Sequence, residues 1–379
     1  MTSIFNNSAK IIKRLVIVVC LSAITVLAAK TPATPEIEQI ISDFRLKTSP
    51  AAVSTYANWT KSKSIVVRVD SDERLKWLQS AVPDVKLIGV NSYAEALSEI
   101  TQADGVMGFC SDEIVTKSSS LKWIQTYTVG VDRCVSEVLI SCNIILTNGQ
   151  RLSGPNIAEH AIALMTTLTR GLDAYHIKQL SREWDRSVLP GADTIWELEG
   201  RTMLVVGLGG IGTEVAKRGH GLGMRVIATR NSRREGPDFV SYVGLADELN
   251  ELAKQADVVV NALPLTPATE GVFNKAFFDA MPSHAYFVSI GRGKSTVTDD
   301  LVSALKNGDI AGAGLDVTDP EPLPTDHALW TMPRVLITPH IAWRSEKYVA
   351  RRWIVMRENL RRYVNGEALL SEVDLDKGY

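Results

Sequence analysis

Neither sign of charge is in excess in this sequence. Lys and Arg number 41 against 43 Asp and Glu, so the formal net charge is −2. Nucleic-acid-binding proteins usually carry a basic surplus, and the composition therefore argues against such a partner. The chain also lacks repeats and low-complexity tracts. Its 379 residues, 45% of them hydrophobic, are too many for one comfortable core and predict a compact, enzyme-like protein of two domains.

Cysteine is scarce as well. No CxxC pair or Cys/His cluster is present, so the sequence does not indicate a metal site. Cys20 lies in an N-terminal apolar run, which leaves Cys110, Cys134 and Cys142. Cys134 and Cys142 can form a disulfide after export, closing a small loop. Three ordinary thiols are an equal alternative, and the spacing does not decide between them.

Long hydrophobic runs are absent apart from one, at residues 15–29, which is shorter than the roughly 20 residues of a membrane-spanning helix. A basic segment, residues 10–14, precedes this run, and Leu27-Ala28-Ala29 ends it. This order is typical of a secretory signal peptide. We expect residues 1–30 to be a signal peptide or, as second choice, an uncleaved anchor. Both place the rest of the chain outside the cytoplasm, exported, periplasmic or anchored facing outside. A cytoplasmic protein with a buried first helix is the alternative.

Residues 31–63 are polar with several prolines and have the composition of a leader or arm. Beyond them, short apolar runs alternate with helical patterns, which predicts parallel strands joined by crossover helices. The predicted strands are residues 64–69, 85–90, 105–109, 123–127, 144–147, 202–206, 225–229, 258–262, 285–290, 312–317 and 335–338. The longest predicted helix is residues 156–181.

We therefore predict an α/β fold with two Rossmann- or flavodoxin-like parallel-sheet domains. Residues 64–155 and 344–379 would form a substrate-binding domain. A dinucleotide-binding domain, residues 156–343, would be inserted into it. The last helical segment, residues 348–363, would return to the first domain.

A glycine motif follows the strand at residues 202–206 and precedes a helix. Gly207, Gly209 and Gly212 stand at G-x-G-x-x-G spacing, with Gly210 and Ile211 between the last two. The first glycine permits a tight turn, the second lets the backbone approach a pyrophosphate, and the third lets the helix pack closely on the sheet. The free N–H groups at the start of the helix also favour phosphate. These five residues are the predicted pyrophosphate site.

The end of the next strand predicts which dinucleotide binds. An acid at this position usually holds the ribose 2′-hydroxyl of NAD. The segment here is Thr229-Arg230-Asn231-Ser232-Arg233-Arg234, which has no carboxylate. Guanidinium groups suit a phosphate ester, so we predict NADP, with NAD as second choice, bound by Arg230, Ser232 and Arg233. A solvated basic turn is the alternative.

Three polar residues follow later strands, at the edge of the sheet where ligands bind in this type of fold. They are Arg292, Glu321 and His340. Reduction of a 2-oxo acid needs a cation that holds the carboxylate, a histidine that donates a proton, and an acid that stabilises the imidazolium. The three residues supply these groups, although each alone also suits an ordinary loop.

The motifs resemble those of the D-isomer-specific 2-hydroxyacid dehydrogenase family. The matching segments are the glycine motif, Asn261-Ala262-Leu263-Pro264-Leu265-Thr266, Gly291-Arg292-Gly293, Gly314-Leu315-Asp316-Val317 with Glu321-Pro322, and Pro339-His340-Ile341-Ala342. Glyoxylate/hydroxypyruvate reductase-like members are the nearest subgroup, because they also place arginine after the second cofactor strand.

The resemblance implies a dehydrogenase that interconverts a small 2-oxo acid, such as glyoxylate or hydroxypyruvate, and the D-2-hydroxy acid, usually as a homodimer. It implies that Arg292 anchors the substrate, His340 is the acid/base and Glu321 is its partner. The loop residues implied to bind the substrate carboxylate are Thr128, Val129 and Gly130. The residues implied to contact the cofactor are Leu263, Pro264, Thr266 and, at the nicotinamide end, Asp316.

Three features depart from the family pattern. Ser289 stands where asparagine is common, Trp343 stands where glycine is usual and leaves the size of the substrate open, and most members have no leader. A dinucleotide-binding sensor or corepressor-like protein without turnover is therefore an alternative, although it would not need all three chemical residues. Formate or phosphonate dehydrogenase-like activity ranks below both, because its additional pocket residues are not recognisable.

Overall fold

The computed structural model describes residues 34–57, 59–189 and 195–379. The predicted signal peptide or anchor, residues 1–30, lies outside the described residues. Within these ranges no helix combines the length and the apolar character needed to cross a membrane.

The first sheet has five parallel strands in the order β2-β1-β3-β4-β5. Their bounds are β1 Ser64–Arg68, β2 Lys86–Val90, β3 Gly105–Met107, β4 Trp123–Gln125 and β5 Ile145–Thr147. The connecting helices are α2 Asp72–Gln79, α3 Tyr93–Glu99, α4 Asp112–Lys117 and α5 Glu137–Ser141. Each of these helices begins after a serine whose side chain accepts a hydrogen bond from the backbone three residues on, and these serines are Ser71, Ser92, Ser111 and Ser136.

The second sheet has seven parallel strands in the order β12-β11-β10-β9-β6-β7-β8. Their bounds are β6 Thr202–Val206, β7 Arg225–Thr229, β8 Tyr242–Gly244, β9 Val258–Asn261, β10 Tyr286–Ser289, β11 Gly312–Leu315 and β12 Val335–Ile337. The connecting helices are α8 Gly210–Gly221, α9 Leu249–Ala253, α10 Lys275–Ala280 and α11 Thr298–Asn307. The sequence did not predict β8, an edge strand of three residues in which Tyr242 is exposed and Gly244 has no side chain, so no apolar run is present.

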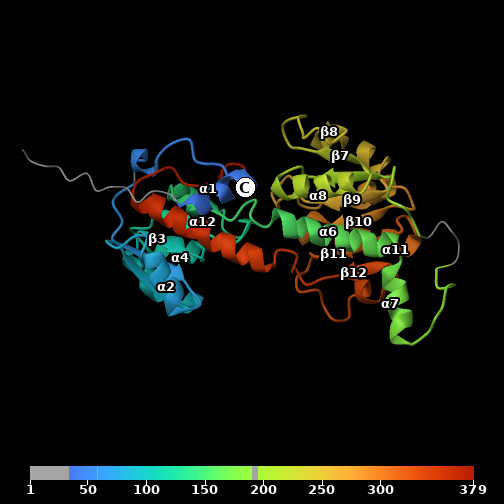
Figure 1. Cartoon of the computed structure of the whole chain (residues 1–379), viewed down its shortest axis with the longest axis horizontal. Helices are drawn as coiled ribbons and strands as arrows, with labels where there is room; N and C mark the ends of the chain where they lie inside the picture. Colours follow the sequence, from blue (N-terminus) through green and yellow to red (C-terminus); the bar gives the residue numbers. More distant parts are fainter. Residues whose placement is uncertain (1–33, 58, 190–194) are drawn as a thin grey trace, which may run out of the picture. The chain divides into compact units, whose positions relative to one another are not determined.

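The predicted long helix at residues 156–181 is two helices in the structure, α6 Gly154–Thr169 and α7 Leu172–Leu180. The prediction of one helix was wrong because Gly171 between them adopts a left-handed conformation, with φ of 66°. Arg334 stabilises the junction, since it donates to the Leu168 carbonyl and to Asp173 Oδ1, the latter over 2.7 Å. Helix α6 packs beside α8 (Figure 1).

The described part of the predicted arm, residues 34–57 and 59–63, is folded against the first sheet. Helix α1, Pro35–Phe44, buries Ile37 and Ile40 in the core of that sheet and packs against the last helix of the chain. Thr48 pairs with Leu370 in an antiparallel bridge. The polar composition therefore concealed an amphipathic helix whose apolar residues recur at helical spacing.

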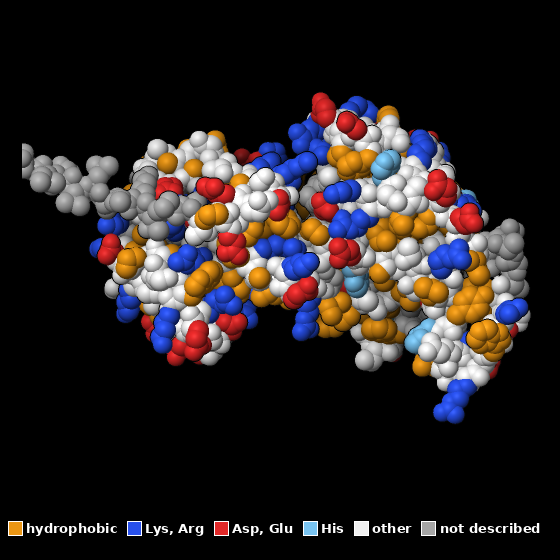
Figure 2. All heavy atoms as spheres, in the orientation of Figure 1, with side chains coloured by type: hydrophobic (Ala, Val, Ile, Leu, Met, Phe, Trp, Pro, Cys, Tyr) orange, Lys and Arg blue, Asp and Glu red, His pale blue; other side chains and the backbone are white. Residues whose placement is uncertain are grey.

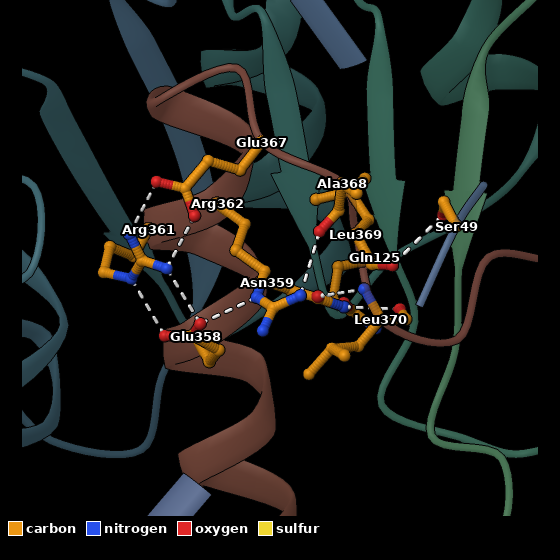
Figure 3. Close-up of polar contacts among 10 residues, drawn as sticks. All are labelled: Ser49, Gln125, Glu358, Asn359, Arg361, Arg362, Glu367, Ala368, Leu369 and Leu370. Atoms are coloured by element: carbon orange, nitrogen blue, oxygen red, sulfur yellow. Dashed lines mark hydrogen bonds and ion pairs between the residues drawn. The ribbon is translucent and has the colours of Figure 1, made fainter. Parts of the chain in front are cut away.

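The last helix, α12 Glu346–Val364, lies across the first sheet although the second sheet precedes it in the chain (Figure 1). Its Tyr363 ring stacks on Trp123 of β4, with centroids 4.6 Å apart. In Figure 3, Asn359 of α12 points at Gln125 of β4, and its Nδ2 donates to Gln125 Oε1 (2.8 Å) and to the Leu370 carbonyl (2.9 Å). The predicted fold of two parallel-sheet domains, one inserted into the other, is thus confirmed.

A buried ionic group also belongs to α12 (Figure 3). Glu358 accepts hydrogen bonds from Arg361 and Arg362, at 2.9 and 2.7 Å, and Arg361 also pairs with Glu367. Burial favours the neutral acid, but the bonds from Arg361 and Arg362 outweigh it and lower the pKa of Glu358. The charges are thus paired inside the domain, as buried charges must be.

The structure pairs Cys110 with Cys134 in a disulfide, with Cα atoms 5.4 Å apart, and leaves Cys142 as an exposed thiol. The suggested Cys134–Cys142 disulfide was therefore wrong. Cys110 follows β3 and Cys134 lies in the segment after β4. Because β3 and β4 are neighbours in the sheet, cysteines distant in sequence meet there, whereas Cys142 lies at the far end of α5.

Candidate active site

The glycine motif forms the turn between β6 and α8. Gly207 has φ of 95°, and a Cβ there would come within 3.0 Å of the Ala262 carbonyl oxygen. A Cβ on Gly212 would overlap the Gly207 carbonyl oxygen, so both positions require glycine. Gly209 has no neighbour within 4 Å of a would-be Cβ and faces open space. The turn is therefore packed closely against the protein at Gly207 and Gly212 and is open at Gly209.

Helix α8 begins at Gly210, and no side chain caps this end. Its first N–H groups, including those of Ile211 and Gly212, have no partner within the helix. Together with the open space at Gly209, they form a cradle that fits a pyrophosphate. The Thr229 hydroxyl holds the loop in place by accepting from the Gly207 N–H over 3.3 Å.

The basic segment after β7 lies beside this cradle. Arg230 is half-buried, and within the described part of the chain its Nε has no hydrogen-bond partner. Ser232 and Arg233 are exposed. Burial and the charge of Arg233 lower the pKa of the Arg230 guanidinium, while Glu235 opposes them. An unpartnered, half-buried guanidinium beside a second arginine fits an anionic group.

Asn261 at the end of β9 positions the loop that contains Leu263, Pro264 and Thr266. It is fully buried, and its Nδ2 donates to the hydroxyls of Ser289 and Ser295, at 3.0 and 2.8 Å. Its Oδ1 accepts from the Leu263 N–H at 3.0 Å. Ser289, one of the departures from the family pattern, is thus an acceptor for Asn261. The sequence analysis had given Asn261 no role, because nothing local shows that it joins the loop after β9 to the end of β10 and to the segment after β10.

Arg292 follows β10 and contacts the loop after β4 in the first sheet. Its Nε donates to Asp132 Oδ1 over 3.0 Å, and its Nη1 donates to the Gly291 carbonyl over 2.8 Å. A Cβ on Gly130 would overlap Arg292 Nη2. The Thr128 hydroxyl donates to the Gly130 carbonyl and shapes the loop. The structure therefore brings Arg292 together with the predicted Thr128–Gly130 loop and adds Asp132, which the sequence analysis missed.

His340 and Glu321 form a hydrogen-bonded pair. Nδ1 of His340 lies 2.7 Å from Glu321 Oε1, and the side chains are 35% and 37% exposed. Glu321 follows β11 and His340 follows β12, the strand beside it in the sheet. His340 has φ of 52°, a conformation that a residue other than glycine seldom adopts and that surrounding contacts must hold. With one ring nitrogen engaged, Nε2 remains to exchange a proton.

Asp316 supplies those contacts. It is 2% exposed, and it accepts from the Thr338 hydroxyl (2.7 Å) and from the N–H groups of Ile341 (2.9 Å) and Ala342 (3.1 Å). The segment that carries His340 is thus fastened at both ends to one buried carboxylate. The predicted contact of Asp316 with a nicotinamide stays a prediction.

Two more features adjoin this segment. His160 of α6 lies 2.8 Å from the Thr338 hydroxyl and so links α6 to β12. Trp343 is 41% exposed, and its ring meets Tyr348 edge-on with centroids 5.9 Å apart. In the described part of the chain, no three His, Cys, Asp or Glu side chains gather in a way that could hold a metal ion.

Comparisons with known proteins agree with this geometry. The family model for the D-isomer specific 2-hydroxyacid dehydrogenase NAD binding domain matches residues 162–342. The glyoxylate reductase/hydroxypyruvate reductase of Homo sapiens is 32% identical over 289 residues, which are 73% of this chain and 85% of the relative.

Solved structures share the fold over most of their length. An NADPH-dependent glyoxylate/hydroxypyruvate reductase from Sinorhizobium meliloti, in complex with NADP and sulfate, has a TM-score of 0.68 at 26% identity, covering 84% of this chain and 100% of that one. A D-lactate dehydrogenase from Aquifex aeolicus, complexed with NAD and lactic acid, has a TM-score of 0.68 at 26% identity, covering 80% and 96%. The chain therefore belongs to the D-isomer specific 2-hydroxyacid dehydrogenase family of NAD(P)-dependent oxidoreductases, which confirms the resemblance found in its sequence.

Proposed function

We propose that this enzyme reduces a small 2-oxo acid to the D-2-hydroxy acid with NADPH. The observation that carries the proposal is the arrangement around Arg292. Its guanidinium lies against Gly130 in the loop after β4 of the five-stranded sheet. Glu321 follows β11, the strand beside β10, and its partner His340 follows β12, the strand beside β11. A carboxylate-binding cation and a proton donor thus follow two strands of the same sheet, β10 and β12, that are separated only by β11.

The substrate carboxylate would bind to Arg292 and to backbone N–H groups of Val129 and Gly130. Charge-assisted, two-pronged hydrogen bonds of this kind fix both the position and the orientation of a carboxylate. Asp132 holds Arg292 through Nε, and Nη2, which lies against Gly130, is left for the substrate. The free energy of binding then serves to orient the oxo carbon.

His340 would donate the proton to the oxo group from Nε2, since Nδ1 is held by Glu321. The carboxylate of Glu321 fixes the orientation of the ring and stabilises its protonated form. Bound NADPH supplies the hydride. In the reverse direction, neutral His340 would accept the proton of the hydroxyl group.

The preference for NADPH follows from Arg230, Ser232 and Arg233. No carboxylate stands at the end of β7, and Arg230 Nε has no hydrogen-bond partner among the residues that the structure describes. Both features support binding of a 2′-phosphate rather than of a free ribose hydroxyl.

Glyoxylate and hydroxypyruvate are the proposed substrates. The human relative and the Sinorhizobium meliloti structure, whose names give these acids, support the choice. The partly exposed Trp343 next to the His340 segment favours a small acid by narrowing the space beside it.

We also propose that the enzyme is exported and dimeric. The Cys110–Cys134 disulfide supports an oxidising compartment. Large apolar side chains exposed on and after α7 support a homodimer that covers them (Figure 2). These side chains are Leu172 (54% exposed), Ile177 (64%), Leu180 (72%) and Trp184 (91%).

An absorbance assay of NADPH and NADH oxidation tests the function. Protein starting at Thr31 would be mixed with glyoxylate, hydroxypyruvate, pyruvate and a bulkier aromatic 2-oxo acid. We expect turnover of glyoxylate and hydroxypyruvate with NADPH and little with the aromatic acid. Folded protein that binds NADPH and turns over none of the acids would instead identify a dinucleotide-binding sensor.

A further inference from the structure

Arg151 lies over the glycine loop although it belongs to a different part of the chain. It stands in the segment between β5 and α6. A Cβ atom on Gly210 would lie 2.9 Å from Arg151 Cγ and 3.6 Å from its Cα. Because Gly210 is the first residue of α8, the stem of Arg151 crosses the open N-terminal end of that helix.

The guanidinium of Arg151 joins a cluster of positive charge. Arg151 acts electrostatically on Arg230, and Arg233 and Arg45 act on Arg151. Burial, followed by the charges of Arg45 and Arg233, lowers the pKa of Arg151. Over residues 34–57, 59–189 and 195–379, no carboxylate forms an ion pair with the Arg151 side chain. Figure 2 shows blue side chains gathered beside the loop between β7 and β8.

Such a cluster is unfavourable unless an anion joins it. Like charges held together in a half-buried place cost free energy, which Glu235 offsets only in part at Arg230. Among the described residues, the buried Nε of Arg230 also has no hydrogen-bond acceptor. The glycine loop and the N–H groups of α8 already serve the pyrophosphate. Arg230 and Arg233 instead follow the end of β7, where the adenosine ribose binds in this type of fold, and the charge of Arg151 acts on Arg230 from the start of α8.

We propose that Arg151 is a specificity-determining residue that completes, with Arg230 and Arg233, a three-arginine site for the 2′-phosphate of NADP(H). This inference rests on the proposed NADPH-dependent function and adds a residue to it from outside the cofactor sheet. The bound phosphate would connect the β5–α6 segment to the end of β7. Cofactor binding would then tie the substrate-side segment to the cofactor sheet.

Calorimetric titration of NADPH and NADH into the wild type, Arg151→Ala and Arg151→Lys tests the site without turnover. We expect Arg151→Ala to raise the Kd for NADPH about 10- to 100-fold, because the charge-assisted hydrogen bond from Arg151 to the 2′-phosphate is lost. The Kd for NADH, which has no 2′-phosphate, should rise by less than about threefold. Lys should restore part of the affinity. Adenosine 2′,5′-bisphosphate should lose affinity in Arg151→Ala, whereas 5′-AMP should not.

Arg45→Ala is the matched control, because Arg45 acts on Arg151 but not on Arg230. An equal loss in Arg45→Ala would mean that diffuse positive potential, not a contact, is responsible, and would overturn the inference. Equal losses for NADPH and NADH in Arg151→Ala would assign Arg151 to the pyrophosphate and also overturn it. Unchanged NADPH binding in a folded Arg151→Ala variant would refute the inference about Arg151 but not the proposed function. A wild type that binds neither dinucleotide would overturn the proposed function as well.

Discussion

Arg292 and Asp132 are 160 positions apart in the sequence, yet Nε of the arginine donates to Oδ1 of the aspartate over 3.0 Å. The bond joins the loop after β10 in the seven-stranded sheet to the loop after β4 in the five-stranded sheet. It fixes the guanidinium against Gly130, where a substrate carboxylate would meet backbone N–H groups. The position of Arg292 therefore depends on both sheets.

Gly130→Ala should impair substrate binding while the protein stays folded. The new Cβ would displace Arg292 Nη2, the far end of a flexible side chain, so the fold can adapt but the guanidinium must move. We expect kcat/KM for glyoxylate to fall roughly 10²-fold with unchanged NADPH affinity, because a shift of about 1 Å is costly for catalysis. Gly149→Ala in the same region is the control, since its Cβ would have ordinary contacts at 3.4 Å or more. Full activity in Gly130→Ala would contradict the placement of the substrate.

His340→Gln should lower kcat by roughly 10²- to 10⁴-fold with the fold and NADPH binding intact, because the side chain can no longer donate a proton. Steady-state kinetics with glyoxylate and the thermal midpoint of unfolding would check this. Turnover close to that of the wild type would remove His340 from the mechanism.

Arg230→Asp should shift the preference from NADPH toward NADH by at least about tenfold in the ratio of kcat/KM values, because the carboxylate repels a 2′-phosphate and can accept from a ribose hydroxyl. Arg234→Ala is a suitable control, since Arg234 is exposed and paired with Glu248 at 2.7 Å. An unchanged ratio in Arg230→Asp would mean that the segment after β7 is only a solvated turn.

Glu358→Gln should destabilise the enzyme near neutral pH and much less in acid. The folded-state pKa of Glu358 is below the ordinary 4.5, so its ionised form contributes stability that is complete above pH 4.5 and is lost as the pH falls through the folded value. At pH 7 we expect a loss on the order of 3 kcal/mol, as for a broken buried ion pair. Urea unfolding of variant and wild type, at pH 7 and in acid, measures the difference between their free energies of unfolding. A difference that grows on acidification would show that ionised Glu358 does not stabilise the folded state.

The complete chain, produced in a bacterium, should be recovered outside the cytoplasm without its leader. We expect the leader to be cleaved off near Ala29. Alkylation without reduction should label only Cys142, and reduction should expose Cys110 and Cys134 as well. Intact mass and peptide mapping check both points, with a chain that starts at Thr31 as the cytoplasmic control. An unprocessed cytoplasmic product would contradict export.

The sequence was sufficient where chemistry depends on local order. The G-x-G-x-x-G turn between β6 and α8 is visible because each glycine meets a backbone requirement within a few residues. Arg292, Glu321 and His340 were predicted as site residues because each stands in a segment that follows an apolar strand, and parallel strands present their carboxyl ends at one edge. The fold class followed from the same alternation of strands and helices.

Other features depended on neighbours that are distant in the chain. The partner of Cys134 is Cys110, which lies in the segment after β3, and the alternative at Cys142 was suggested by spacing alone. A helix at residues 35–44 and the break at Gly171 were missed because polar flanks and one glycine are weak local signals.

The sequence by itself determined the family, the two α/β domains and the strand ends that carry reactive side chains, because those depend on periodicity and short motifs. Only the tertiary structure decided that Asp132 fixes Arg292, that Asn261 joins the loop after β9 to the end of β10 and the segment after it, and that Arg151 crosses the start of α8. Such contacts form when crossover connections bring separate strands together, and the spacing of residues along the chain contains no measure of that distance.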